Sequence, residues 1–89
     1  MKQAHIIYSG FVQGIGFRFT TQKFAEHLGL KGWVKNLSNG SVEMIVEGEE
    51  SDIRALIEKI DAHFKDHIQY KDVGFSSADG KFFDFRIAY

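Results

Sequence analysis

The chain has 89 residues, of which 44% are hydrophobic, which is enough for one hydrophobic core but too little for a second domain. It contains no cysteine, which excludes disulfides and thiolate metal sites and favours a reducing compartment. The formal net charge of −1 gives no electrostatic reason to expect binding to nucleic acid or to an anionic membrane. The apolar run near the N-terminus is shorter than a signal peptide requires, and no stretch is long enough to cross a bilayer, so we expect a cytoplasmic protein.

The first part of the chain predicts a strand followed by a helix. Residues 4–12 are rich in β-branched and aromatic side chains, as is typical of a strand. From Phe19 onward apolar residues recur at helical spacing, and Gly29 follows them as a C-terminal stop signal.

A β-hairpin is predicted next. Residues 31–37 predict a short strand, and the Asn-Gly pair at 39–40 predicts a turn because both residue types tolerate positive φ. Residues 41–48 alternate between apolar and polar side chains, which indicates a second strand. We expect the carboxylates of Glu43 and Glu47 to face outward from it.

The last part of the chain predicts a helix and two strands. Ser51 is expected to cap a helix in which apolar residues up to Phe64 repeat on one face. Residues 67–77 and 81–89 predict strands, separated by a turn at 78–80. The order β-α-β-β-α-β with an extra terminal strand predicts an α+β protein, a ferredoxin-like βαββαβ sandwich in which two helices cover one face of an antiparallel sheet.

This order of elements brings two distant segments together. A right-handed β-α-β crossover makes the first two strands parallel, and in the split arrangement one antiparallel strand lies between them. The loop at residues 10–18 and Asn36 therefore become neighbours at one edge of the sheet. Open sheets commonly bind ligands at this edge, beyond the carboxyl ends of parallel strands.

The loop GFVQGIGFRF, residues 10–19, holds three glycines and one arginine. It does not match the dinucleotide pattern G-x-G-x-x-G, because Phe19 stands where the last glycine is required, and it lacks the Gly-Lys-Ser/Thr of a Walker loop. A glycine-permitted bend before a helix N-terminus can direct several backbone N–H groups at an anion, and Arg18 adds a planar fork that matches two phosphate oxygens. A tight turn with a surface arginine explains the same residues about as well, so this pattern leaves both interpretations open.

Two segments resemble the signatures of a known family. GFVQGIGFR at residues 10–18 and GWVKNLSNGSVE at residues 32–43 resemble the acylphosphatase signatures G-x-V-Q-G-V-G-F-R and G-W-V-R-N-x-x-D-G-x-V-E. They occur in the same order and at similar spacing, and the length and predicted fold also fit. The resemblance thus covers residues 1–89 as a single acylphosphatase-like domain.

Three positions depart from these signatures. Ile15 replaces the usual valine, Lys35 the usual arginine and Asn39 the usual aspartate. The first keeps a β-branched apolar side chain, the second keeps a positive charge and the third still supports a turn. None of them alters the chemistry that the family performs.

The resemblance implies an enzyme that hydrolyses the carboxyl-phosphate bond of small acyl phosphates to a carboxylate and inorganic phosphate. Asn36 orients the attacking water, and the phosphate is bound by the Arg18 side chain and by the backbone amides of Gln13, Gly14, Ile15, Gly16, Phe17 and Arg18. It further implies a monomer, inhibited by its product phosphate, that needs neither a cofactor nor a metal.

The chemistry of the reaction fits this short set of residues. A carboxylate leaves easily because the pKa of its conjugate acid is near 4, so no general acid is required. Phosphoryl transfer demands mainly positioning and charge stabilisation, which amides and one arginine can supply. Asn36 is a poor base, but its carbonyl and amino groups can hold a water in line.

Other features of the sequence favour ordinary structural roles. The four histidines lack the spacing of metal ligands, and Trp33 and the phenylalanines near the C-terminus suit packing on the sheet. Phe11 and Phe17 flank the loop, and each can either support it or contact the acyl group.

Two competing functions are weighed against hydrolysis. One is a noncatalytic anion- or carbamoyl-phosphate-binding module, because acylphosphatase-like domains also occur within larger maturation proteins. The other is RNA binding through aromatic residues on the central strands, which many ferredoxin-like domains perform. The predicted strand at 41–48 has two acidic residues and no aromatic residue, which argues against RNA.

Overall fold

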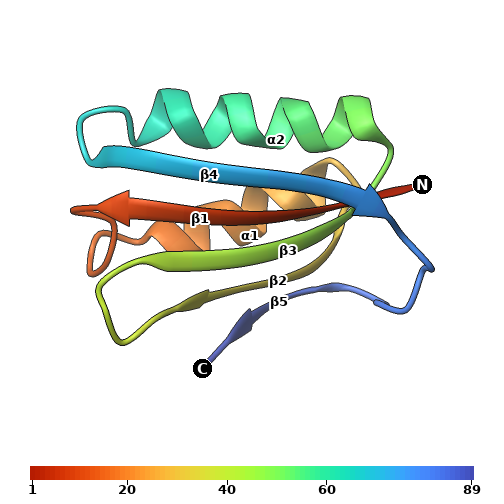
Figure 1. The fold of residues 1–89 in the computed structure, drawn as a ribbon, viewed down its shortest axis with the longest axis horizontal. Coiled ribbons are helices and arrows are strands. Elements are labelled where there is room, and N and C mark those ends of the chain that lie inside the picture. Colours follow the sequence, from red (N-terminus) through yellow and green to blue (C-terminus); the bar gives the residue numbers. More distant parts are fainter.

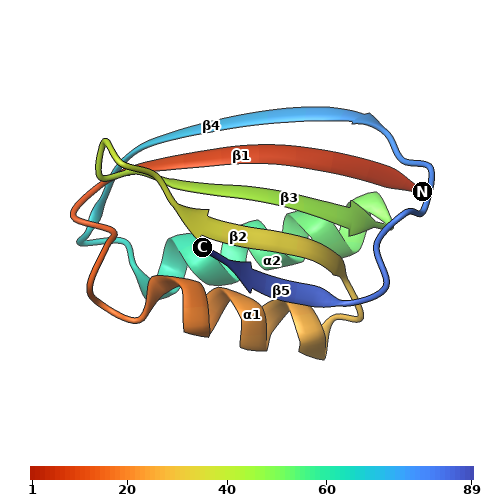
Figure 2. The same ribbon diagram turned by 90° about the horizontal axis from the view of Figure 1, so that it is seen from below.

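Two helices pack on one face of a five-stranded sheet in the computed structural model, which describes residues 1–89 (Figures 1 and 2). This two-layer arrangement confirms the predicted ferredoxin-like fold. The elements in chain order are β1 (Lys2–Gly10), α1 (Phe17–His27), β2 (Lys31–Asn36), β3 (Val42–Gly48), α2 (Glu50–His63), β4 (Ile68–Ser77) and β5 (Phe85–Ala88).

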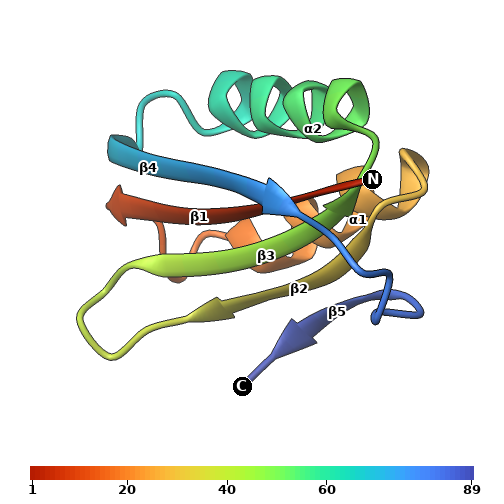
Figure 3. The same ribbon diagram turned by 45° about the vertical axis from the view of Figure 1, so that its right-hand side comes forward.

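The sheet has the strand order β4-β1-β3-β2-β5. The pairs β1–β3, β1–β4 and β2–β3 are antiparallel as predicted, whereas β5 pairs in parallel with β2, so the complete sheet is mixed. This follows from the path of the chain after β4. The link between β4 and β5 crosses the end of the sheet to the opposite edge and reverses direction once, which leaves β5 parallel to β2 (Figure 3).

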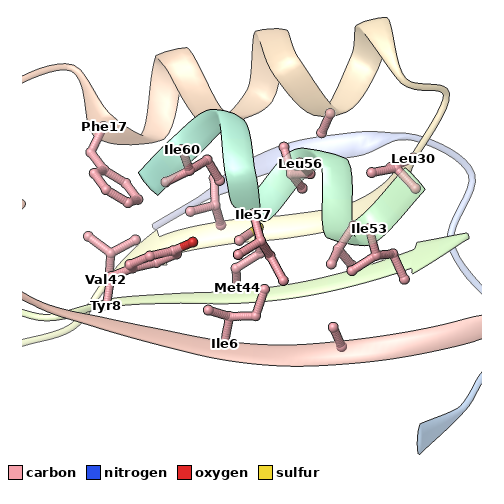
Figure 4. Packing of buried hydrophobic residues seen from close by; sticks show 14 of the residues in the cluster. Ile6, Tyr8, Phe17, Leu30, Val42, Met44, Ile53, Leu56, Ile57 and Ile60 are labelled. Atoms are coloured by element: carbon pink, nitrogen blue, oxygen red, sulfur yellow. The ribbon is translucent and has the colours of Figure 1, made fainter. Parts of the chain in front are cut away.

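The hydrophobic core lies between the sheet and the helices. Figure 4 shows Ile6 and Tyr8 of β1 on the side of the sheet that faces Ile57 and Ile60 of α2. The ring of Phe17, the first residue of α1, is only 2% exposed. It packs against the rings of Tyr8 and Phe64, with centroids 5.2 and 4.6 Å away, so the start of α1 is anchored in the core.

The ends of α1 follow local backbone rules. The helix begins at Phe17, two residues earlier than the apolar spacing predicts. It ends at His27, and Gly29 follows as the predicted stop signal with a φ of 71°, a conformation that glycine adopts without strain. The N–H of Leu30 donates to the carbonyl of Ala25 at 2.9 Å, and the N–H of Gly29 donates to that of Glu26 at 3.1 Å, which satisfies carbonyls left free by the helix end.

The predicted cap of α2 is wrong, and the outward-facing Glu47 is more buried than a surface carboxylate. Ser51 does not cap α2, because the helix begins at Glu50 with Glu49 as its N-cap; carboxylates at Glu50 and Asp52 in the first turn favour the positive helix N-terminus. Glu47 is on the face of β3 away from the helices, as expected, but it is only 3% exposed. The alternating pattern predicts on which face Glu47 lies but not how exposed it is. Its side chain is buried because β3 is an inner strand between β1 and β2.

Two neighbouring phenylalanines of α1 offer a test of this packing. Phe17→Ala removes a ring buried against Tyr8 and Phe64 and should lower the free energy of unfolding by about 3–5 kcal/mol. Phe19→Ala removes a ring that is 60% exposed and should change it by less than about 1 kcal/mol. Urea unfolding of both variants measures the difference, and equal losses would show that the start of α1 is not anchored through Phe17.

Candidate active site

The sheet register brings the loop after β1 close to the end of β2. Tyr8 of β1 and Asn36 of β2 both pair with Val42 of β3, so the two parallel strands are separated by one antiparallel strand. This confirms the arrangement predicted from the order of the elements. Asn36 and the connection from β1 to α1 therefore lie at the same end of the sheet.

A pocket of about 290 Å³ lies at this end of the sheet. Arg18 and Asn36 both line it, and so do Gly14, Gly16 and Phe17 from the predicted phosphate-binding set. Gln13 and Ile15 from that set do not line it. The remaining wall is formed by Val12, Phe19, Ile87 and Tyr89.

The connection between β1 and α1, residues 11–16, has two glycines, and its backbone requires both. Gly14 and Gly16 have φ angles of 77° and 78°, in the left-handed region that other residues rarely adopt. No atom lies within 4 Å of a Cβ added at either position, so the requirement comes from the backbone angle and not from a lack of space.

The N-terminus of α1 leaves backbone donors free. Its first helical hydrogen bond runs from the N–H of Thr20 to the carbonyl of Gly16, so the N–H groups of Phe17, Arg18 and Phe19 have no partner within the helix. No side chain caps this end, and its first turn holds no acidic residue. The free N–H groups and the positive end of the helix dipole favour an anion at this place.

The positive charge of Arg18 is not neutralised within the protein. Its guanidinium lies 5.1 Å from the ring centroid of Tyr89, and it forms no ion pair. The Tyr89 ring is a weak partner for a cation compared with a carboxylate. The guanidinium fork therefore stays available for a second, anionic partner.

Asn36 holds an unused hydrogen-bond acceptor. Its side-chain Oδ1 atom is buried and has no hydrogen-bond partner in the protein. Buried acceptors without a partner are rare, because each costs about 1–3 kcal/mol. Asn36 also lines the pocket, so its side-chain amide is close to any water or ligand bound there.

Gln13 ties the loop to the hairpin that follows Asn36. Its side-chain Nε2 donates to the backbone carbonyls of Leu37 and Ser41, both at 2.8 Å. Within the hairpin, Asn39 accepts a bond from the N–H of Ser41 at 3.0 Å, so the departure from aspartate preserves the turn. Sequence reasoning assigned only the amide of Gln13; the available signal was an amide side chain with two N–H donors in a loop of glycines and apolar residues.

The aromatic residues at the pocket differ from those considered in the sequence. Phe11 is 70% exposed and does not line the pocket, and the ring of Phe17 belongs mainly to the core. The exposed aromatic side chains on the pocket wall are Phe19 and Tyr89. Tyr89 was missed because only the parallel pairing of β5 with β2 brings the C-terminal residues beside Asn36.

One titratable group beneath this region is strongly perturbed. Burial, together with the nearby carboxylate of Asp61, raises the pKa of the Tyr8 hydroxyl well above its usual value. The hydroxyl donates to Asp61 Oδ1 at 3.2 Å, and Lys71 pairs with the other oxygen of the same carboxylate. Tyr8 does not line the pocket, so this neutral hydroxyl has a structural role linking β1, α2 and β4.

Comparison with known proteins agrees with this geometry. The acylphosphatase family model matches residues 4–87, which is nearly the entire chain. The chain belongs to the acylphosphatase family. It is 40% identical to an acylphosphatase of Lactobacillus gasseri, with complete coverage of both chains, and 40% identical to one of Syntrophus aciditrophicus, covering 94% of that protein.

Solved structures place the acylphosphatase fold in two settings. The crystal structure of the acylphosphatase from Bacillus subtilis matches both chains over their full length with a TM-score of 0.90 and 33% identity. HypF of T. kodakarensis matches this whole chain with a TM-score of 0.81 and 34% identity, but the match covers only 12% of that larger protein. The present chain is an acylphosphatase, a hydrolase of a family that acts on small acyl phosphates.

Two further observations concern the protein as a whole. Neither helix is long and apolar enough to cross a membrane. No three of its His, Asp or Glu side chains gather in a group of the kind that holds a metal ion.

The contacts of Gln13 predict that its side chain holds the acylphosphatase site together. In Gln13→Met two carbonyls lose their donor, so turnover of benzoyl phosphate should fall by about 10- to 100-fold because Asn36 and the loop are no longer held in register. Gln22→Met is a matched control. The Gln22 side chain also donates to a backbone carbonyl, that of Phe85, at 3.1 Å, but Gln22 does not line the pocket. Equal turnover in the two variants would contradict the role given to Gln13.

Proposed function

We propose that this acylphosphatase works by in-line attack of a water held by Asn36 on a phosphoryl group held by Arg18 and the loop amides. The observation that carries the proposal is that Asn36, whose side-chain Oδ1 has no partner in the protein, lines the same pocket as Arg18, whose guanidinium forms no ion pair. One group suits a water and the other suits a phosphate. Their shared pocket supports a division of labour between them.

The phosphoryl group is held by donors that are already in place. The guanidinium of Arg18 binds two of its oxygens, and the amides of the loop residues that line the pocket, including the free N–H groups of Phe17 and Arg18 at the start of α1, bind the others. In the transition state, negative charge is spread over the equatorial oxygens of this group. Donors fixed by the fold stabilise that charge without rearranging during the reaction.

The water needs orientation more than deprotonation. The transition state of phosphoryl transfer is loose in most analyses, so the nucleophile gains little from a strong base. The Oδ1 atom of Asn36 accepts a hydrogen bond from the water and directs an oxygen lone pair at phosphorus. The carboxylate leaves without a proton from an acid, because the pKa of its conjugate acid is near 4.

The proposed function also covers the cellular location and oligomeric state of the enzyme, its inhibition by product and the contacts of the acyl group. We infer that the chain acts as a cytoplasmic monomer, which agrees with its lack of cysteine. Inorganic phosphate, the product, should compete with substrate for the same donors. The substrate's acyl group would lie against Phe19 and Tyr89, the exposed aromatic residues of the pocket wall.

A noncatalytic anion- or carbamoyl-phosphate-binding module is a second candidate. The likeness to 12% of a HypF chain favours it, because there the same fold is part of a larger protein. Turnover of benzoyl phosphate by the purified chain separates the two functions.

Two variants test the division of labour. Asn36→Ala should lower turnover of benzoyl phosphate by at least about 100-fold while inorganic phosphate still binds. Arg18→Gln should lose both turnover and phosphate binding. Arg86→Gln serves as the control, because this exposed arginine pairs with Asp84 away from the pocket. Steady-state kinetics and phosphate titration give the answer, and an equal loss of phosphate affinity in Asn36→Ala and Arg18→Gln would refute the assignment.

Phosphate binding should also appear as thermal stabilisation. A ligand that binds only the folded chain stabilises it by about 1.4 kcal/mol at ten times its Kd. For a domain of this size that corresponds to a rise in Tm of several degrees. Calorimetry with phosphate, and with chloride at matched ionic strength, measures the rise in the unmodified protein and in Arg18→Gln. A full rise that persists in Arg18→Gln would place the phosphate elsewhere.

A further inference from the structure

A second cleft, of about 480 Å³, lies between the two helices. The helices run side by side on the covered face of the sheet (Figure 2). Both supply basic side chains to the cleft, and α1 also supplies aromatic ones. The residues that matter are Lys23 and His27 from α1, Lys59 and His63 from α2, and the phenylalanines Phe19 and Phe24.

The charged side chains that line the cleft are basic. No carboxylate lines it, although the chain as a whole has more acidic than basic residues and a net charge of −1. Neither Lys23 nor Lys59 forms an ion pair. On α2, Glu50 pairs with Arg54 and Asp61 with Lys71. Glu58 on α2 and Glu26 on α1 form no ion pair but lie outside the cleft lining.

Aromatic rings hold the two lysines at the cleft. The ammonium of Lys23 lies 5.5 Å from the ring centroid of Phe19, and that of Lys59 lies 5.7 Å from the ring centroid of Phe24. The ring of His63 packs edge-on against Phe24 at 5.8 Å. Cation–π contacts restrict the ammonium groups without neutralising their charge. The lysines therefore remain free to bind an anion.

The other pockets outside the active site differ in this respect. A cavity of about 370 Å³ on the open face of the sheet contains Lys35 and Lys81, but its Arg86 is already paired with Asp84. A smaller pocket beside α2 contains the ion pair of Asp61 and Lys71. The cleft between the helices alone combines several basic groups with no acidic one.

We propose that this cleft is a second anion site, which binds a polyphosphate group. Lysine ammoniums bind phosphate as point charges, and the histidines add ring N–H donors. The volume is in the range of small-molecule sites, about 300–1,000 Å³, and the donors come from two helices. A chain of linked phosphates can reach both sets of donors, whereas a single phosphate fits the arginine and amides of the active site.

The two sites are adjacent but chemically distinct. Phe19 is in the wall of both, and none of the four basic residues of the cleft lines the active-site pocket. Binding in the cleft is therefore independent of the mechanism proposed for hydrolysis. Because the proposed active site also binds anions, it competes with the cleft for any anionic probe.

Binding of inorganic triphosphate tests the proposal. Titration at low ionic strength, followed by amide NMR of the unmodified protein, should shift the signals of residues 19–27 and 59–63. Shifts confined to residues 13–18 and 36 would mean that the probe occupies only the active site, and they would overturn the proposal. The same titration of Arg18→Gln, in which the active site binds anions poorly, should leave the cleft signals responsive.

A pair of double variants separates local from general charge effects. Lys23→Gln with Lys59→Gln should weaken triphosphate binding by at least about tenfold in the Arg18→Gln background. Lys2→Gln with Lys31→Gln removes the same charge at exposed positions outside the cleft and should leave the affinity within about twofold. Equal weakening in both double variants would show a nonspecific charge effect and would refute the site.

A comparison of ATP with inorganic triphosphate, on the same variants, shows whether the cleft recognises the phosphate chain or the nucleoside. ATP and inorganic triphosphate should bind with similar affinity if the phosphate chain is the group recognised. Binding of ATP without binding of triphosphate would contradict the proposal, because the base and sugar would then supply the recognition. Turnover of benzoyl phosphate by Lys23→Gln/Lys59→Gln should match that of the unmodified protein, which verifies that the variant folds.

Discussion

The burial of Phe17 is the contact on which the geometry of this protein depends. Its ring fills the space between Tyr8 of β1 and Phe64, directly after α2, and so joins the sheet to both helices at one point. The next residue along the chain is Arg18. Because a helix turn is rigid once its first side chain is locked in the core, the position of the guanidinium and the direction of the free amides are set by hydrophobic packing.

The proposed active site is composed of groups that the fold leaves unsatisfied. The guanidinium of Arg18 has no carboxylate, Oδ1 of Asn36 has no donor, and the first turn of α1 has no cap. Each costs stability in a domain whose total is of the order of 5–15 kcal/mol. Packing and the Gln13 hydrogen bonds offset that cost. Such unsatisfied groups are characteristic of preorganised sites, where the ligand completes the bonding.

Much of the fold, and the placing of the loop and Asn36 at one candidate site, could be predicted from the sequence. Helical spacing, the Asn-Gly turn and the crossover rule sufficed to put the loop beside Asn36. Helical spacing and the Asn-Gly turn are local signals, and the crossover rule follows from the right-handedness of β-α-β connections. The orientation of β5, the burial of Glu47 and the presence of Tyr89 in the pocket depend on which distant strands lie together. No local pattern encodes those pairings, and the bonds of the Gln13 side chain depend on them in turn.

The strand order has a consequence for how the chain reaches this state. β1 lies between β3 and β4, and β2 is bordered by the last strand, so no initial fragment of the chain can close the sheet or cover its core. Domains dominated by such distant pairings pass through a transition state with costly loop closure and fold slowly compared with helical bundles of the same size. Ile87 and Tyr89 belong to the pocket wall, so the pocket is complete only once β5 has paired with β2. Formation of the candidate site therefore depends on a contact between distant parts of the chain, which places it late in folding.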